Sequence, residues 1–151
     1  WADYCAGQVL DEVRRLGLSP STAIVIHADH GWHLGEYNMW EKRTVWEFGT
    51  RVPFMVHVPW LPQSHGKRSG APVELIDVFP TVIDLANLPD VTHDTFRLEG
   101  RSLLPLLNDP SMATLPDRDF ALSAYPRCPK VHGPVWDDWC IHIVERSSFR
   151  F

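Results

Sequence analysis

The sequence predicts an α/β fold, in which helices cover a β-sheet. Three observations support this class: an apolar pattern at helical spacing near the start of the chain, two short runs rich in Val, Ile and Phe, and a second helical stripe after them. The order helix, strand, loop, strand, helix is typical of layered α/β structure. At 151 residues the chain is long enough for one domain with a substantial core.

The first helix is expected between Asp3 and Gly17, where apolar residues recur at near-helical spacing and the glycine provides a stop. A β-branched run follows over Thr22–Ala28. It is bounded by Pro20 and Ser21 on one side and by an Asp-His-Gly turn on the other, so it reads as a buried strand.

Later elements follow from the same patterns. A Val- and Phe-rich run predicts the second strand, a polar stretch predicts a loop, and an apolar stripe predicts a helix in which a proline near the first turn is tolerated. Two more runs predict strands. In chain order these segments are Arg51–Pro59, Leu61–Pro72, about Asp77 to Pro89, Arg118–Pro126, and a strand that begins at Ile141.

Composition restricts the classes of function. The net charge of -5 gives no support for nucleic-acid binding, which usually needs a basic face. No apolar run approaches the roughly 18 residues of a membrane span. Basic residues cluster locally, at Lys42-Arg43 and at Lys67-Arg68, where they could meet an anionic substrate.

The three cysteines decide little. Cys5, Cys128 and Cys140 form no CxxC pair and no zinc-finger spacing. Cys128 and Cys140 could be joined in an oxidising compartment, and the sequence leaves that open.

Two metal-binding residue types stand where the first strand ends. Asp29 offers an oxygen ligand and His30 a nitrogen ligand, and Gly31 permits a backbone turn that a side chain would obstruct. Two ligands are too few for a tight site, because Ca²⁺ takes six to eight oxygens and Zn²⁺ usually takes four ligands. Any further ligands must therefore come from elsewhere.

Lys42 lies beyond the loop that follows. Its ammonium group can meet an oxyanion as a point charge, and a metal with a lysine is a recurrent way to hold a phosphate or sulfate group. Taken alone, an Asp-His pair is also typical of a helix cap or a turn, and Lys42 of a solvated surface charge. Trp32 is more often a packing or rim residue, and His33 reads as structural.

The same stretch resembles the sulfatase family. The resemblance is carried by "ADHGWHLGEYNMWEK" (28–42), "TRVPFMVHVP" (50–59), "VELIDVFPTVIDLANLP" (73–89) and "LEGRSLLPLL" (98–107), with "SAYPR" (123–127) similar to a later strand of the family. The blocks stand in family order across most of the chain.

This resemblance implies the alkaline-phosphatase-like α/β fold, with a large central mixed sheet between helices. It implies that Asp29 and His30 are ligands of one Ca²⁺ ion, that Lys42 contacts the sulfate group, and that Trp32 lines the sugar pocket. The implied activity is that of a sulfuric ester hydrolase acting on a sulfated sugar of the glycosaminoglycan type. The family's nucleophile is a formylglycine made from a Cys in a C-x-P-x-R motif.

The chain departs from that pattern, because none of its three cysteines is followed by x-Pro-x-Arg. The nucleophile and the remaining calcium ligands are therefore expected upstream of Trp1. We expect residues 1–151 to be the C-terminal portion of a sulfatase catalytic domain, inactive without the remainder of its own polypeptide.

Two other functions remain open. One is a phosphodiesterase or phosphonate hydrolase of the same superfamily, and the other is a non-catalytic sulfatase-like binding protein. Resemblance alone indicates a lysosomal, extracellular or periplasmic location.

Overall fold

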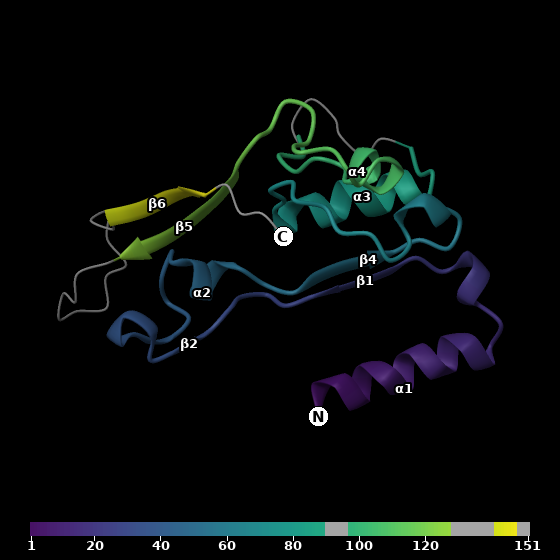
Figure 1. Ribbon diagram of the computed structural model, residues 1–151, viewed down its shortest axis with the longest axis horizontal. Coiled ribbons are helices and arrows are strands. Elements are labelled where there is room, and N and C mark those ends of the chain that lie inside the picture. Colours follow the sequence, from purple (N-terminus) through teal and green to yellow (C-terminus); the bar gives the residue numbers. More distant parts are fainter. Residues whose placement is uncertain (90–96, 128–140, 148–151) are drawn as a thin grey trace.

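A two-stranded sheet lies between two helical layers. The computed structural model describes residues 1–89, 97–127 and 141–147. In Figure 1, β1 (Ile24–His27) and β4 (Phe54–His57) separate α1 (Ala2–Arg15) from the layer that holds α3 (Val78–Leu85) and α4 (Leu104–Asn108). This arrangement confirms the expected α/β class.

The other elements are short. They connect the layers or extend from them, and two more strand pairs form beside the main one. Their bounds are β2 (His33–Leu34), β3 (Trp40–Glu41), α2 (Glu47–Thr50), β5 (Ala121–Arg127), β6 (Ile141–Ser147) and the 3-10 turns Ser19–Ser21, Glu36–Asn38, Pro62–Ser64 and Leu75–Asp77.

Local sequence signals account for the helix ends. Helix α1 stops before Gly17, whose φ of +69° is a left-handed conformation that glycine adopts without steric cost. Pro80 falls in the first turn of α3, where its missing N–H removes no helical hydrogen bond. Both were expected from the sequence.

Strands β1 and β4 pair in antiparallel register, with Ile24 opposite His57 and His27 opposite Phe54. The large sheet that the resemblance implies is represented in the described residues by this pair. Asp29 and His30 follow the carboxyl end of β1 as expected. Because β4 runs the other way, its amino end lies beside them, and this brings the segment around Arg51 close to the turn.

The core lies on the α3 and α4 side of the sheet. Its buried apolar residues are Ala71, Leu103, Leu106 and Leu115, with Phe54, Val73 and Met112 packed against them. On the opposite side, α1 has no buried residue, and a cavity of about 400 Å³ separates its apolar face from β1 and β4. The sheet is thus held mainly by the α3 and α4 layer.

Two further expectations concern membranes and cysteines. None of the helices in the described segments has the length and apolar character of a membrane span. Cys5 is exposed and free. Cys128 and Cys140, whose pairing the sequence leaves open, lie outside the described residues.

Candidate active site

The turn after β1 depends on the absence of a side chain at Gly31. Its N–H donates to the Gly49 carbonyl at 2.9 Å. A Cβ atom at Gly31 would lie 2.1 Å from the Phe48 carbonyl oxygen and 2.8 Å from that of Arg51. Both neighbours are backbone atoms and cannot swing aside, so only glycine lets the Asp29-His30 turn approach α2 this closely.

His30 presents one ring nitrogen outward. Its Nδ1 lies 2.8 Å from the Gly31 carbonyl oxygen, which can only accept, so Nδ1 carries the hydrogen in the neutral ring. The Nε2 lone pair is then free to accept, and Lys42 Nζ lies 2.6 Å away. Asp29 Oδ2 is 3.5 Å from the same nitrogen. The turn thus brings together the three side chains that the sequence singled out.

A hairpin positions Lys42 beside His30. Strands β2 and β3 pair His33 with Glu41 and Leu34 with Trp40. After the hairpin, the Thr44 N–H donates to the Lys42 carbonyl at 2.8 Å. The buried His33 ring holds the Thr44 hydroxyl, with 2.7 Å between Nε2 and Oγ1. His33 is therefore structural, as the sequence indicated, and it braces the segment that carries Lys42.

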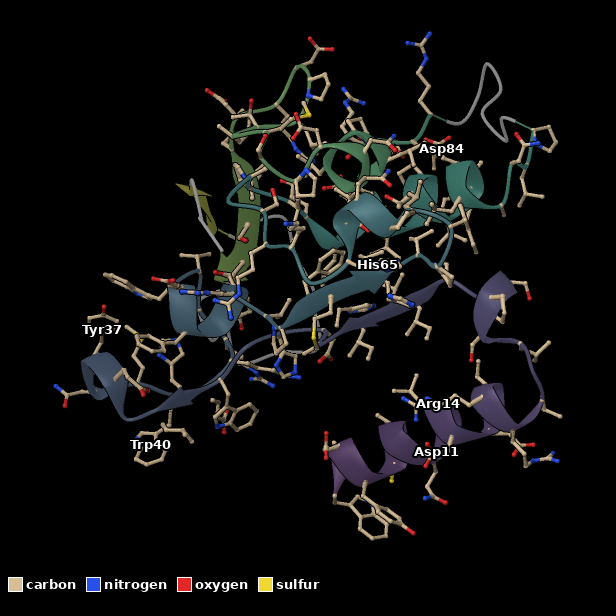
Figure 2. All side chains as sticks on the ribbon, turned by 45° about the vertical axis from the view of Figure 1, so that its right-hand side comes forward. Asp11, Arg14, Tyr37, Trp40, His65 and Asp84 are labelled. Atoms are coloured by element: carbon tan, nitrogen blue, oxygen red, sulfur yellow. The ribbon has the colours of Figure 1, made fainter. Side chains whose placement is uncertain are left out.

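The hairpin tip has an unusual backbone. Tyr37, Asn38 and Glu41 adopt φ values of 55°, 57° and 72°, which non-glycine residues seldom do. The Leu34 N–H donates to a Glu36 carboxylate oxygen at 2.6 Å. This backbone bond is the main reason that the pKa of Glu36 lies below its ordinary value. Figure 2 shows Tyr37 and Trp40 at this outer end of the molecule.

Aromatic rings surround the hairpin. Tyr37 stacks on Trp46 with centroids 5.0 Å apart, and the Trp32 ring lies 6.1 Å from the His30 ring. Trp32 is half exposed and is absent from the lining of the adjacent cavity. The structure therefore places Trp32 beside His30 but outside that cavity, and its assignment to a sugar pocket stays a prediction.

A cavity of about 680 Å³ opens beside the three side chains. Asp29, His30 and Lys42 form one wall, and β5 with the segment around Arg101 forms another. Cations and carboxylates both line it, so it suits a polar ligand. Its other charged lining residues are Arg51, Glu74, Glu99, Arg101, Asp117 and Arg118.

A buried ionic cluster anchors the far wall. The Asp77 carboxylate is inaccessible to solvent and accepts the Glu74 and Arg101 N–H groups, each at 2.8 Å, as well as both terminal nitrogens of Arg118. Arg118 also donates to Glu74 at 2.5 Å. A second Glu74 oxygen accepts the Leu122 N–H and so attaches β5.

Sequence reasoning missed this cluster. The E-x-x-D spacing of Glu74 and Asp77 signals a helix cap, and the structure contains that reciprocal capping box. No local signal identifies Arg118, because it stands 41 residues after Asp77.

The donor set fits part of a metal site. Two ligands at right angles around an ion, each about 2.4 Å away, lie about 3.4 Å apart. The 3.5 Å between Asp29 Oδ2 and His30 Nε2 matches this separation. The Asp29 side chain is 84% exposed, so its second oxygen is available to other groups. Among the residues that the structure describes, no third His, Cys, Asp or Glu side chain converges on the pair.

Comparisons of the sequence and of the structure with known proteins point to the same family. The sulfatase family model matches residues 1–88. The chain is 35% identical to an extracellular sulfatase SULF-1 homolog of Drosophila melanogaster over 70% of this chain and 9% of that protein. It is 30% identical to human iduronate 2-sulfatase over 91% of this chain and 31% of that protein.

A solved structure shows the same fold. The phosphonate monoester hydrolase from Silicibacter pomeroyi superposes with a TM-score of 0.66 at 28% identity, covering 89% of this chain and 25% of its own. The expected alkaline-phosphatase-like fold is thereby confirmed. The chain spans less than a third of the length of each of these three relatives.

Proposed function

Because the chain belongs to the sulfatase family, we propose that it supplies one wall of the catalytic centre of a sulfuric ester hydrolase. A single observation carries this proposal. Asp29, His30 and Lys42, which the family resemblance marks as site residues, converge at the end of β1, with 2.6 Å between Lys42 Nζ and His30 Nε2.

In this proposal Asp29 and His30 are ligands of one Ca²⁺ ion, which would supply positive charge to polarise the sulfate group. The Gly31 carbonyl fixes the His30 ring through Nδ1, and the ion would take the place of Lys42 Nζ as the partner of the Nε2 lone pair. Lys42 places a second positive charge where an anionic oxygen of the substrate would lie. The His33–Thr44 contact holds the Lys42 backbone and so limits the movement of that charge.

We also propose that residues 1–151 are the C-terminal portion of a catalytic domain. Cys5, Cys128 and Cys140 lack the C-x-P-x-R motif from which the family makes its formylglycine. The chain also covers only 31% of human iduronate 2-sulfatase. The nucleophile and the remaining metal ligands then belong to the rest of the polypeptide, and this portion alone is inactive.

The proposed substrate is a sulfated sugar of the glycosaminoglycan type. The likeness to iduronate 2-sulfatase extends over 91% of this chain and supports that class. Trp32, half exposed beside His30, is proposed to contact the sugar ring. An extracellular or lysosomal location is proposed with it, because one relative is named as an extracellular sulfatase.

The test uses turnover of para-nitrophenyl sulfate by the full-length protein. Lys42→Gln is expected to lower kcat/KM by about 10²–10³-fold, because it removes a charge that faces the sulfate. Arg43→Gln is the matched control, since this neighbouring exposed cation does not line the cavity. Equal activities of the two variants would overturn the assignment of Lys42.

The proposed metal ligands, Asp29 and His30, are tested by alanine variants with matched controls. Asp29→Ala and His30→Ala should each abolish calcium-dependent turnover, whereas Asp3→Ala on α1 and His27→Ala on β1 should not. Isothermal calorimetry on the isolated 151-residue chain should show Ca²⁺ binding weaker than about micromolar, because two ligands leave an ion mostly hydrated. Tight binding by the isolated chain would contradict the proposal that further ligands lie elsewhere.

One observation favours a second candidate, a phosphonate monoester hydrolase. The enzyme of that name from Silicibacter pomeroyi shares the fold at 28% identity. Comparing kcat/KM for aryl sulfate and aryl phosphonate esters separates the two. Faster turnover of the phosphonate ester by the full-length protein would replace the sulfatase assignment.

A further inference from the structure

A second cavity of about 660 Å³ lies on the α4 side of β4. Buried apolar side chains line part of it, including Ala71, Leu103, Leu106 and Leu107. The segment that follows the 3-10 turn Pro62–Ser64 contributes the polar part of its lining. Asp29, His30 and Lys42, the three side chains of the candidate active site, do not line this cavity.

The polar lining carries one sign of charge. Lys67, Arg68, His57 and His65 line the cavity together with Arg51, and no Asp or Glu is among its lining residues in the described part of the chain. Lys67 and Arg68 are exposed and make no ion pair with any described residue. A cleft with charges of one sign concentrates ligands of the opposite sign.

A histidine pair forms the edge nearest β4. The His57 and His65 rings lie 4.8 Å apart. His65 Nε2 lies 2.9 Å from the Val58 carbonyl oxygen, so that nitrogen must carry the hydrogen and donate it. The contact fixes the His65 ring beside β4, where Figure 2 shows it. The segment that leads to Lys67 and Arg68 is therefore tied to the sheet.

The two cavities adjoin along β4. Arg51, Phe54 and Val73 line both of them. Arg51 is paired with Glu47 at 2.7 Å, which leaves it partly neutralised. Lys42 lines the first cavity and Lys67 and Arg68 line the second, so cationic side chains stand in both of these adjoining cavities.

We propose that the second cavity binds the continuation of a sulfated oligosaccharide whose reacting residue occupies the first. The inference rests on the proposed function and specifies its substrate as a chain of several sulfated sugars. Sulfate groups would meet Lys67 and Arg68, which are exposed to solvent. A small aryl sulfate would reach only the first cavity.

The experiment measures binding of heparin-derived oligosaccharides to the full-length protein by fluorescence anisotropy. The probes are a labelled hexasaccharide, long enough to enter both cavities, and a labelled disaccharide. The test variant is Lys67→Gln with Arg68→Gln. The control is Arg14→Gln with Arg15→Gln, which removes the same charge from α1, away from this cavity.

The test variant is expected to bind the hexasaccharide about tenfold more weakly, since two exposed ion contacts are lost. Its disaccharide binding and its turnover of para-nitrophenyl sulfate should change by less than about twofold. The control should bind both probes as the unaltered protein does. Two results would overturn the proposed role of the second cavity and leave the proposed function intact. One is a hexasaccharide affinity that the test variant does not change, and the other is an equal loss of affinity for both probes. Absence of aryl sulfate turnover by the unaltered protein would overturn the proposed function instead.

Discussion

Replacing Asp77 by Ala tests the buried cluster that anchors the far wall of the site. In the folded protein this carboxylate accepts two backbone N–H groups and both terminal nitrogens of Arg118. The Arg118 side chain is only 10% exposed, and after the substitution it keeps only Glu74 as a charged partner. A charge buried without its partner is the largest penalty that the substitution introduces.

The magnitude follows from that loss. Removing one partner of a buried ion pair costs about 3–5 kcal/mol of folding free energy. Glu74 remains 2.5 Å from Arg118, so we expect the lower end, about 3 kcal/mol. In a domain of this size that corresponds to a fall in Tm of about 6–12 °C. Asp77→Asn keeps the volume and one acceptor oxygen, and it should cost less.

Urea unfolding followed by circular dichroism measures the effect. A double-mutant cycle with Arg118→Met isolates the pair: the double variant should be less destabilised than the sum of the single variants by at least about 1 kcal/mol. Asp84→Ala removes an exposed carboxylate from the same segment, in the position labelled in Figure 2, and should cost under about 0.5 kcal/mol. Additive single effects, or a cost for Asp77→Ala no larger than that of the control, would refute the reasoning.

Three more predictions concern the turn and the hairpin. Gly31→Ala should destabilise the fold by about 1–3 kcal/mol in urea unfolding, because the new Cβ meets two backbone carbonyl groups; an unchanged midpoint would contradict this. Thr44→Val should cost about 1–3 kcal/mol, since it leaves the Nε2 of buried His33 without a partner, whereas Thr44→Ser should restore most of the loss. The Glu36 carboxylate has a lowered pKa in the folded hairpin, so its support is present above the ordinary value of 4.5 and is lost as pH falls through the folded value. The Leu34 amide resonance should therefore shift in acid in the unaltered protein but not in Glu36→Gln.

Local patterns in the sequence were sufficient to predict many of the helices and strands. The strands β1 and β4 lie inside the expected segments Thr22–Ala28 and Arg51–Pro59, because β-branched runs bounded by turn residues have few alternatives. The same reasoning found α3, in which Thr81 and Ile83 are buried while Phe79 and Val82 remain exposed. The ends were less accurate, since each strand is shorter than its apolar run and hydrogen-bond pairing, rather than composition, sets its length.

The candidate site was predictable only in part. Asp29 and His30 follow β1 directly, so their placement needs no tertiary information. The approach of Lys42 to His30 depends on positive φ values at Tyr37, Asn38 and Glu41, which no glycine signals. The link between Asp77 and Arg118 spans 41 residues and depends on how separate segments pack. Such long-range contacts leave no periodic trace in a single sequence.

A single short hairpin connects His30 and Lys42 in the sequence and holds these two site residues together. Its strands pair Leu34 with Trp40, and the residues between them form the outer tip. The pairing of Leu34 with Trp40 sets the position at which Lys42 follows the hairpin, so a deletion in the tip that shifts this register would move Lys42 relative to His30. Changes of length in this tip are therefore compatible with the site only where the pairs His33–Glu41 and Leu34–Trp40 are kept.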